Sequence, residues 1–333
     1  MLKINSVFTG IFAQVVNMII SASRRTDIPA FYSDWLINRL NAGYCLTKNP
    51  YNPTQVRRVS LLPQDVDGIV LWTKNAAPLL ASSGEMNSPL SALPKLSALE
   101  AFSYYFQYSI TPYHSDMESG LADCKVGGFP ADTQVQARSA VAPKFKAKVI
   151  IPAFIELAKR IGSERVIWRY DPIVITPRYN FEYHIGAFTR LCELLAGSTQ
   201  KCVISFVVAY KSVAKSLHEI GNIEVSVEDK IRLAESLLQI AKDHGITLCA
   251  CCESAELYEI GVQPISCVDS TMFGKSFPRD KNQRNGCNCA VSVDIGVYNS
   301  CMNGCRYCYA NHIDSVVRKN HAGHDVNSEF LIE

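Results

Sequence analysis

The chain has little net charge and no long apolar run. Its 33 Lys and Arg residues nearly balance 31 Asp and Glu residues, which leaves a formal charge of +2. This balance excludes a global field that would draw the protein to nucleic acid or to a membrane surface, although a local basic groove stays open. The segment 7–20 is apolar, but Gln14 and Asn17 interrupt it and it is too short to span a bilayer. No internal repeat is visible, so nothing indicates a repeat architecture.

A secretory signal is missing as well. Only Lys3 precedes the apolar N-terminal segment, and no clear small-residue cleavage site follows it. The chain nevertheless has 13 cysteines, which without a signal indicate a reducing cytoplasm where thiols serve metal binding or catalysis. We therefore expect a cytoplasmic protein with no membrane contact. Residues 1–17 are either an N-terminal extension or lie upstream of a natural start at Met18.

Three of the cysteines lie on one short loop near the C-terminus. Cys301, Cys305 and Cys308 are spaced C-x3-C-x2-C, and Tyr307 stands directly before the last of them. Thiolates are the soft ligands that hold iron–sulfur clusters, and three on one loop can bind three corners of a [4Fe–4S] cube. The fourth iron then has no nearby cysteine, and this open position can bind a substrate.

This spacing resembles the signature of the radical S-adenosylmethionine enzymes. In those enzymes the open iron binds the amino and carboxylate groups of S-adenosylmethionine, and the reduced cluster breaks a C–S bond to release a 5′-deoxyadenosyl radical. Two other interpretations stay open on spacing alone. Cys305 and Cys308 could join Cys287 and Cys289 in a four-cysteine zinc site, or they could form a redox dithiol.

Short apolar runs rich in β-branched residues alternate with helical patterns along the chain. This alternation predicts an α/β fold with a parallel sheet. The candidate strands are Met18–Ser23, Ile69–Lys74, Tyr104–Thr111, Arg165–Tyr170, Cys202–Ala209, Thr247–Cys252, Ile265–Asp269 and Val291–Val297. The candidate helices are Ser33–Leu40, Pro152–Ile161, Phe181–Leu195, Ser226–His244 and Ile313–Lys319. Eight strands suggest a closed (β/α)8 barrel of the TIM type, formed by residues 18–320 as a single domain.

Two stretches do not follow the alternation. Residues 82–100 are rich in Ser, Pro and Leu, and residues 115–148 show little periodicity. We expect a long loop or an insertion at 115–148. Residues 321–333 are expected to form a C-terminal tail.

Charged residues follow the first two candidate strands directly. In a parallel barrel the chemistry lies on the loops after the carboxyl ends of the strands. Arg24, Arg25 or Lys74 could therefore pair with the carboxylate of S-adenosylmethionine, since guanidinium groups suit carboxylates. The alternative is a structural ion pair with Asp27 or Asp171.

Later strands also end in polar groups. Glu253 and Asp269 could accept hydrogen bonds from ribose hydroxyl groups. Tyr307 is expected to pack beside the cluster or the adenine, unless it serves only the packing of its own loop. We expect most of these strand-end groups to line one pocket around the cysteine loop.

The position of the cysteine loop along the chain is unusual. In radical S-adenosylmethionine enzymes it follows the first strand, whereas here it follows the last. Because the ends of a barrel meet, the same architecture can be cut at a different loop. Val291–Val297, the cysteine loop and Ile313–Lys319 would then form the first βα unit and close against Met18–Ser23. The order of motifs thus predicts a circularly permuted barrel.

Several stretches carry a resemblance to a known family. They read IISASRRTDIPA at 19–30, WRYDPI at 168–173, DKNQR at 280–284, DIGVYN at 294–299 and YAN at 309–311, together with the cysteine loop. These stretches resemble an uncharacterised bacterial family, domain of unknown function 1848, over most of residues 18–320 outside 82–148. That family is noted for C-terminal cysteines similar to the N-terminal cluster motif of radical S-adenosylmethionine proteins. The resemblance implies the cluster and the permuted fold, and it brings no substrate.

Further cysteines precede the loop. Strand alternation places Cys249 and Cys251 on one face of their strand and the next cysteine on the other. We expect a four-thiolate set that could hold a second iron–sulfur cluster or zinc, and the alternative is buried thiols without a metal. The expected set is Cys252, Cys267, Cys287 and Cys289. At roughly 3.3 Å per strand residue, Cys289 should lie over ~15 Å from Cys301 and should not reach the main cluster.

Two functions therefore remain for testing. The first is a radical S-adenosylmethionine enzyme of unknown substrate, supplied with electrons by a donor such as flavodoxin or ferredoxin. The second is a non-catalytic cysteine-rich module that binds zinc or an iron–sulfur cluster. A weaker similarity to spore photoproduct lyase-like proteins rests on Thr73, Lys74 and residues 169–172, and it hints at a nucleic-acid substrate.

Overall fold

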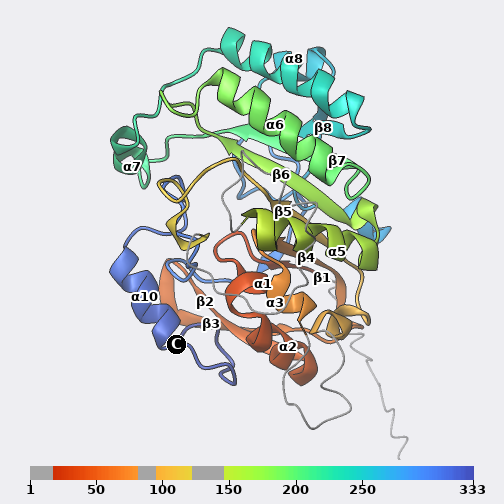
Figure 1. The fold of residues 1–333 in the computed structure, drawn as a ribbon. Coiled ribbons are helices and arrows are strands. Elements are labelled where there is room, and N and C mark those ends of the chain that lie inside the picture. The colour runs from red at the N-terminus through yellow and green to blue at the C-terminus, as the bar shows by residue number, and fades with distance from the viewer. Residues whose placement is uncertain (1–17, 82–94, 122–145) are drawn as a thin grey trace, which may run out of the picture.

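The computed structural model describes residues 18–81, 95–121 and 146–333 and contains one large parallel sheet (Figure 1). Its strands are β1 (Met18–Ala22), β4 (Val66–Thr73), β5 (Tyr104–Ser109), β6 (Val166–Ile173), β7 (Lys201–Phe206), β8 (Thr247–Ala250), β9 (Gln263–Pro264) and β10 (Val293–Asp294). They are ordered β10-β1-β4-β5-β6-β7-β8-β9, and each neighbouring pair is parallel. The predicted α/β fold with a parallel sheet is confirmed.

The first and last strands in chain order, β1 and β10, lie side by side. Ile20 is opposite Val293, and Ser21 is opposite Asp294, in a parallel register. This pairing was predicted from the order of the sequence motifs and is confirmed. It places the loop that follows β10 next to the loop that follows β1.

A closed barrel is not shown. The strand order ends at β9 and β10, and these two edges do not form a ladder with each other in the described residues. One backbone hydrogen bond, from Ala290 N to Val268 O at 2.9 Å, joins the segments beside them. We refer to this gap between the two edges as the seam.

The predicted strand Ile265–Asp269 is wrong in its position, because the observed strand is Gln263–Pro264. Side chains take the place of a neighbouring strand here. The carbonyl oxygen of Cys267 accepts hydrogen bonds from Tyr105 Oη and Gln107 Nε2, both at 2.9 Å. That oxygen is therefore satisfied without a partner strand.

The described residues also form helices. They are α1 (Ile28–Phe31), α2 (Ser33–Ala42), α3 (Ala77–Leu80), α5 (Ile151–Ile161), α6 (Phe181–Leu195), α7 (Ala214–Glu219), α8 (Val227–Asp243), α9 (Ala255–Glu259) and α10 (Asp314–Ala322). Figure 1 shows α5, α6 and α8 side by side along one side of the sheet. Ser226 caps α8, because its Oγ accepts a hydrogen bond from Asp229 N at 3.1 Å.

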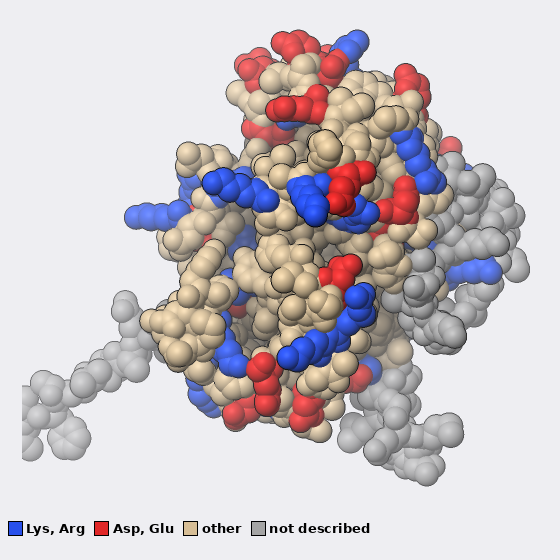
Figure 2. Space-filling view, turned by 90° about the vertical axis from the view of Figure 1, so that its left-hand side faces the viewer, with Lys and Arg blue, Asp and Glu red and all other residues tan. Residues whose placement is uncertain are grey.

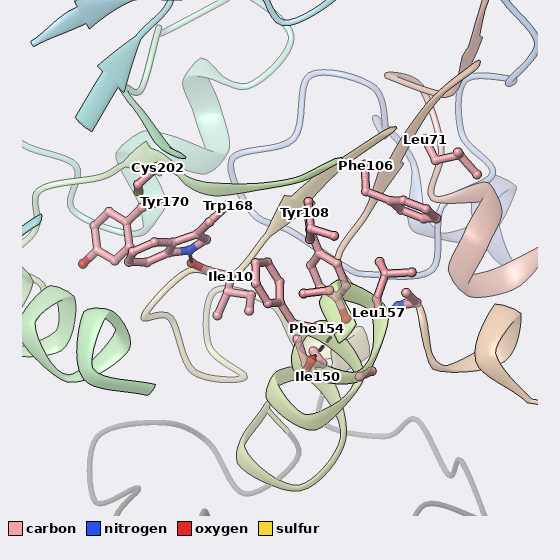
Figure 3. Packing of buried hydrophobic residues seen from close by; sticks show 14 of the residues in the cluster. Leu71, Phe106, Tyr108, Ile110, Ile150, Phe154, Leu157, Trp168, Tyr170 and Cys202 are labelled. Atoms are coloured by element: carbon pink, nitrogen blue, oxygen red, sulfur yellow. Dashed lines mark hydrogen bonds between the residues drawn. The ribbon is translucent and has the colours of Figure 1, made fainter. Parts of the chain in front are cut away.

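The main core lies between the sheet and α5 and α6 (Figure 3). Trp168 of β6 stacks on Phe188 of α6 with 5.1 Å between ring centroids. Tyr108 of β5 meets Phe154 of α5 edge to face at 5.0 Å, and its hydroxyl donates to Ile150 O at 3.2 Å. Burial of such aromatic side chains supplies a large part of the stability of a core.

The inner face of the sheet has its own apolar cluster. Side chains from six neighbouring strands line this face. They are Ile19, Val70, Tyr105, Ile167, Val203 and Cys249, and they pack with cysteines from the loops around the seam.

A two-stranded antiparallel sheet was not predicted. It consists of β2 (Tyr44–Asn49) and β3 (Asn52–Ser60), and β3 is exposed along most of its length. The C-terminal residues lie against it, because Leu46 N donates to Glu329 O at 2.9 Å. An exposed hairpin has no buried face, so its hydrophobic pattern is weak.

Some of the predicted segments lie partly or wholly outside the described residues. These are the N-terminal extension at 1–17, residues 82–94 of the Ser-, Pro- and Leu-rich stretch, and residues 122–145 of the expected loop or insertion. The described ends of the expected loop at 115–148 form short helical turns, Ser119–Leu121 and Lys146–Ile150. Within the described ranges, no helix has both the length and the apolar character needed to cross a membrane.

Candidate metal centre

The cysteine loop follows β10, which ends at Asp294, and hydrogen bonds hold its two ends together. Asn299 N donates to Ala310 O at 2.9 Å, and Asn311 Nδ2 donates to Cys301 O at 2.6 Å. These two bonds close the loop on itself. The thiols of Cys301, Cys305 and Cys308 are half-buried within it. The loop therefore presents its three cysteines from a defined backbone.

Asp27 joins this loop to its neighbours. Its Oδ2 accepts hydrogen bonds from Lys74 N at 2.7 Å and from Asn303 Nδ2 at 3.0 Å, while Oδ1 caps α1 through Ala30 N at 3.0 Å. Burial raises the pKa of the Asp27 carboxyl, and these hydrogen bonds offset part of that effect. One buried carboxyl group thus ties together the loops that follow β1, β4 and β10.

The cysteine loop packs backbone against backbone on the turn at 117–120. Gly120 N donates to Asn303 O at 3.1 Å. A Cβ at Gly120 would lie 1.7 Å from Met302 O, so only glycine fits there. Gly304 has a φ of +61°, and a Cβ on it would lie 2.2 Å from Ser119 Oγ. The contact requires glycine on both sides.

A buried carboxylate lies beneath the loop. Glu118 pairs with Lys74 at 2.9 Å between Oε1 and Nζ, and with Lys146 through its other oxygen. Tyr307 Oη also donates to it, and Thr111 Oγ1 does so at 2.7 Å. Burial alone would raise the pKa of Glu118, but the two ammonium groups hold it well below its usual range.

Glu118 and Lys146 were missed in the sequence because both lie in the stretch without periodicity. No motif connects them to the cysteine loop. The contact that does so is a bridge between Glu118 and Cys305, which are far apart in the chain. Tyr307 was expected to pack beside the cluster or the adenine, and in the structure its hydroxyl group contacts the buried carboxylate.

The predicted cations differ in how they are held. Burial would lower the pKa of Lys74, but Glu118 and then Cys305 raise it, so its ammonium stays charged within the pair. Lys74 thus has a structural ion pair, but with Glu118 and not with the expected Asp27 or Asp171. Asp171 pairs instead with Arg169, at 2.6 Å.

The side chains of Arg24 and Arg25 have different partners. Arg24 Nη1 donates to Gln283 Oε1 at 3.1 Å, while Arg25 stacks on Tyr298 with 5.1 Å from its guanidinium carbon to the ring centroid. Arg25 also lines a cavity of about 350 Å³ beside β10 and the β2–β3 hairpin. Among the residues that the structure describes, neither arginine has a carboxylate partner. Both cations are thus available to an anionic ligand.

The two strand-end carboxylates have local partners. Glu253 Oε1 accepts a hydrogen bond from Phe206 N at 2.9 Å, and burial raises the pKa of Glu253. Asp269 Oδ1 accepts from Thr271 N at 2.9 Å and so caps the turn Ser270–Phe273. Asp269 thus has a structural task in addition to any contact with a ligand.

The outer surface near these loops carries both signs of charge. In the space-filling view, Lys and Arg side chains cross the hollowed middle of the face that carries α7 and α10 (Figure 2). Asp and Glu side chains gather mainly above and below them. Neither sign forms a continuous surface on this face, so its charge does not single out nucleic acid as a substrate.

A second group of thiols lies at the seam. The thiols of Cys251, Cys287 and Cys289 are buried and lie within 4.8 Å of one another. Such a buried triad fits iron–sulfur or metal binding. Cys252 was predicted in this set, yet the structure brings its neighbour Cys251 into the triad. Alternation had placed Cys251 on the same face as Cys249, and both lie in the inner cluster.

Comparison with known families identifies the chain. Residues 19–310 match the family described as Domain of unknown function (DUF1848). The chain belongs to this family. The match includes the arginine-rich loop after β1 and the whole cysteine loop, and it confirms the resemblance noted in the sequence. No curated protein matches the chain.

Two solved structures give weak likenesses to this member of the family. "Crystal structure of HydG: A maturase of the [FeFe]-hydrogenase" has a TM-score of 0.32 and 12% identity, over 75% of this chain and 57% of that chain. This chain thus spans a little over half of its length. A Rhizobium etli pyruvate carboxylase has a TM-score of 0.22 and 10% identity, over 69% of this chain and 23% of that chain. TM-scores this low do not support any conclusion about the fold or the function of this chain.

Proposed function

We propose that this protein is a radical S-adenosylmethionine enzyme in which Cys301, Cys305 and Cys308 hold a [4Fe–4S] cluster. The observation that carries the proposal is the parallel pairing of β10 with β1. It puts the cysteine loop at the carboxyl end of a strand that neighbours β1. In a permuted barrel this strand would take the place of the first strand, which carries the cluster loop in the unpermuted arrangement.

The residues of the loop fit such a cluster. Backbone amides point at its sulfur atoms: Ala310 N donates to Cys308 Sγ at 3.4 Å, and the amides of Asn303 and Asp27 donate to Cys301. Amide donors of this kind tune and orient cluster thiolates. The loop offers three thiols to four irons, which leaves one iron for S-adenosylmethionine. When bound, the cluster would supply one electron to the sulfonium group, delivered by a donor of the flavodoxin or ferredoxin type.

Arg24 is the residue that we assign to the carboxylate of S-adenosylmethionine. Lys74 is held by Glu118, and Arg25 lies over Tyr298. The guanidinium of Arg24 donates to Gln283 Oε1, has no carboxylate partner among the described residues, and has the forked shape that suits a carboxylate. Glu253 and Asp269 both stay candidates for the ribose, since each uses one carboxylate oxygen in a local hydrogen bond. Tyr307 acts as a positioning residue through Glu118.

Anaerobic reconstitution with iron and sulfide tests the proposal. We expect about four irons and four sulfides on the loop, an EPR signal after reduction, and 5′-deoxyadenosine when S-adenosylmethionine and reductant are added. Replacing Cys301, Cys305 and Cys308 by Ala should abolish all three. The matched control replaces the buried cysteines Cys45, Cys192 and Cys202 by Ala, which removes the same number of thiols away from the loop.

Two results would contradict the proposal. The first is a loop variant that keeps its full content of iron and sulfide. The second is a wild-type protein that binds only zinc, or that forms a cluster which does not respond to S-adenosylmethionine and yields no 5′-deoxyadenosine. Either result would favour the non-catalytic metal-binding module.

A further inference from the structure

Four buried thiols gather at the seam between the two edges of the sheet. They belong to Cys251, Cys267, Cys287 and Cys289. We propose that these thiols bind a single divalent ion of the zinc type, Zn²⁺ or Fe²⁺, in a tetrahedral site that joins the two open edges of the sheet. This site is separate from the cysteine loop and would be present whether or not the protein cleaves S-adenosylmethionine.

The spacing of three of the sulfur atoms fits one ion, and the fourth thiol contacts two of the three. Zinc–thiolate bonds of about 2.3 Å arranged as a tetrahedron hold the sulfurs roughly 3.8 Å apart. Cys251, Cys287 and Cys289 have their thiols within 4.8 Å of one another. Cys267 is in hydrogen-bonding contact with the thiols of Cys251 and Cys289. In an iron–sulfur cube each cysteine binds a different iron, so the sulfurs lie farther apart than in a site with one metal.

Hydrogen bonds to the sulfurs support the site. Val268 N donates to Cys289 Sγ at 3.4 Å, and Cys289 N donates to Cys287 Sγ at 3.5 Å. Amide donors lower the basicity of thiolates and fix their direction. Arg169 Nη1 lies 3.2 Å from Cys267 Sγ. A divalent ion with four thiolates carries a charge of −2, and the buried guanidinium offsets part of it.

The position of the thiols explains why an ion would be useful. Cys251 follows β8, Cys267 follows β9, and Cys287 and Cys289 precede β10. The ligands thus come from both sides of the gap in the ladder, where one backbone hydrogen bond from Ala290 to Val268 joins the segments. A metal bound to both edges would supply the connection that a β-ladder supplies in a closed barrel. Its binding energy would add to the stability of the folded state.

Cys252 provides a matched control within the same segment. Its thiol lies 3.8 Å from that of Cys251, but it does not belong to the three thiols that lie within 4.8 Å of one another, and it contacts Arg284. It is half-buried, whereas the four proposed ligands are buried. We therefore expect Cys252→Ala to keep the ion.

The test starts from the variant in which Cys301, Cys305 and Cys308 are Ala, so that cluster iron does not obscure the second metal. The full chain is expressed in medium with zinc and iron and purified without chelator. We expect one metal ion per chain and no acid-labile sulfide. X-ray absorption at the metal edge should show four sulfur neighbours at about 2.3 Å and no second metal nearby. The edge identifies the ion as zinc or iron.

Adding Cys287→Ser and Cys289→Ser to this background should remove the ion, and Cys252→Ala should not. If the double variant fails to fold, the absorption spectrum of the parent still decides the question. Acid-labile sulfide with several irons per chain would overturn the proposal, because it indicates a polynuclear cluster. A chain without metal, or an ion with oxygen and nitrogen neighbours, would overturn it as well. Neither outcome bears on the cluster of the cysteine loop, which is absent from this background.

Discussion

Lys74 Nζ lies 2.9 Å from Glu118 Oε1, and this buried ion pair joins the end of β4 to the turn under the cysteine loop. The other oxygen of Glu118 contacts Lys146, whose ammonium also donates to the carbonyl oxygens of Thr111 and Tyr113 at 3.0 and 2.7 Å. One carboxylate thus compensates two buried ammonium groups. Burial raises the pKa of the Cys305 thiol well above its usual range, and the nearby Lys74 ammonium offsets part of that effect.

Replacing Glu118 by Gln should destabilise the fold strongly. The substitution leaves two buried ammonium groups without a counter-charge, and removal of one partner from such a network costs about 3–5 kcal/mol. Urea unfolding of the purified protein measures the loss. The control is Glu219→Gln, which breaks the exposed pair with Arg306 of the cysteine loop and should cost less than about 1 kcal/mol. Equal losses in the two variants would refute the role assigned to the buried pair.

The contribution of Glu118 should depend on pH in a defined direction. Its folded-state pKa is depressed, so it stabilises the fold above the unfolded pKa of about 4.3, and this contribution is lost as the pH falls through the folded value. We therefore expect the difference in unfolding free energy between wild type and Glu118→Gln to be constant from pH 7 to about pH 5. It should narrow progressively below about pH 4.3. A difference that widens on acidification would contradict the depressed pKa.

Gly304 should not tolerate a side chain. Its φ is +61°, and a Cβ would lie 2.2 Å from Ser119 Oγ and 3.0 Å from Gly120 N. Gly304→Ala should therefore lose more stability than the roughly 1 kcal/mol expected from the backbone conformation alone, and it should release iron from the reconstituted cluster faster. Gly197→Ala is the control, since Gly197 has a φ of +76° but nothing within 4 Å of a Cβ. Iron release to a chelator, followed by absorbance, compares the two variants.

The central strands of the sheet were predictable because they are buried on both faces. Such strands appear as continuous apolar, β-branched runs, and the pairing of β1 with β10 followed from the order of the motifs. The edge strand β9 is exposed, and its predicted position was wrong. The seam was not predictable. Whether an edge closes depends on a few hydrogen bonds, such as those that Tyr105 and Gln107 donate to Cys267 O, and side chains from distant strands supply them. No local pattern reports such contacts.

The candidate metal centre also has a part that the sequence predicts and a part that it does not. Cys301, Cys305 and Cys308 are visible in the sequence because the spacing of the ligands is local. Glu118 reaches the loop through tertiary contacts across more than 180 residues, so nothing in its neighbourhood marks it. The choice of Cys252 for the seam site followed strand alternation, but β8 ends at Ala250, and the thiol that joins Cys287 and Cys289 is that of Cys251. Alternation is informative only within a strand.

Arg169 should govern how tightly the seam retains its ion. Its guanidinium contacts Cys267 Sγ at 3.2 Å, and Arg169→Gln removes that charge while keeping a donor of similar reach. Loss of a partner that contacts a metal ligand typically weakens metal binding by about 10–100-fold. Competition with a chromogenic chelator measures the affinity. The control is Arg284→Gln. Arg284 donates to Cys251 O at 3.0 Å and contacts the thiol of Cys252, which is not a proposed ligand, so this change should lower the metal affinity less.

The last prediction separates the two metals through Cys289. This residue contacts Cys287 and Cys251 at the seam, and it precedes β10, whereas the cysteine loop follows that strand. If the loop cluster has an iron without a cysteine, S-adenosylmethionine should shift the EPR spectrum of the reduced protein. Cys289→Ala should leave that shift intact while the single ion at the seam is lost.

Cys301→Ala should abolish the cluster signal and keep the ion at the seam. This change removes a ligand of the loop cluster and leaves the four seam thiols in place. A Cys289→Ala variant that loses the response to S-adenosylmethionine but keeps a reduced cluster would mean that Cys289 belongs to the site where S-adenosylmethionine binds. In that case the seam could not be an independent structural site, because one thiol cannot hold the edge of the sheet at the seam and take part in the cluster across the strand.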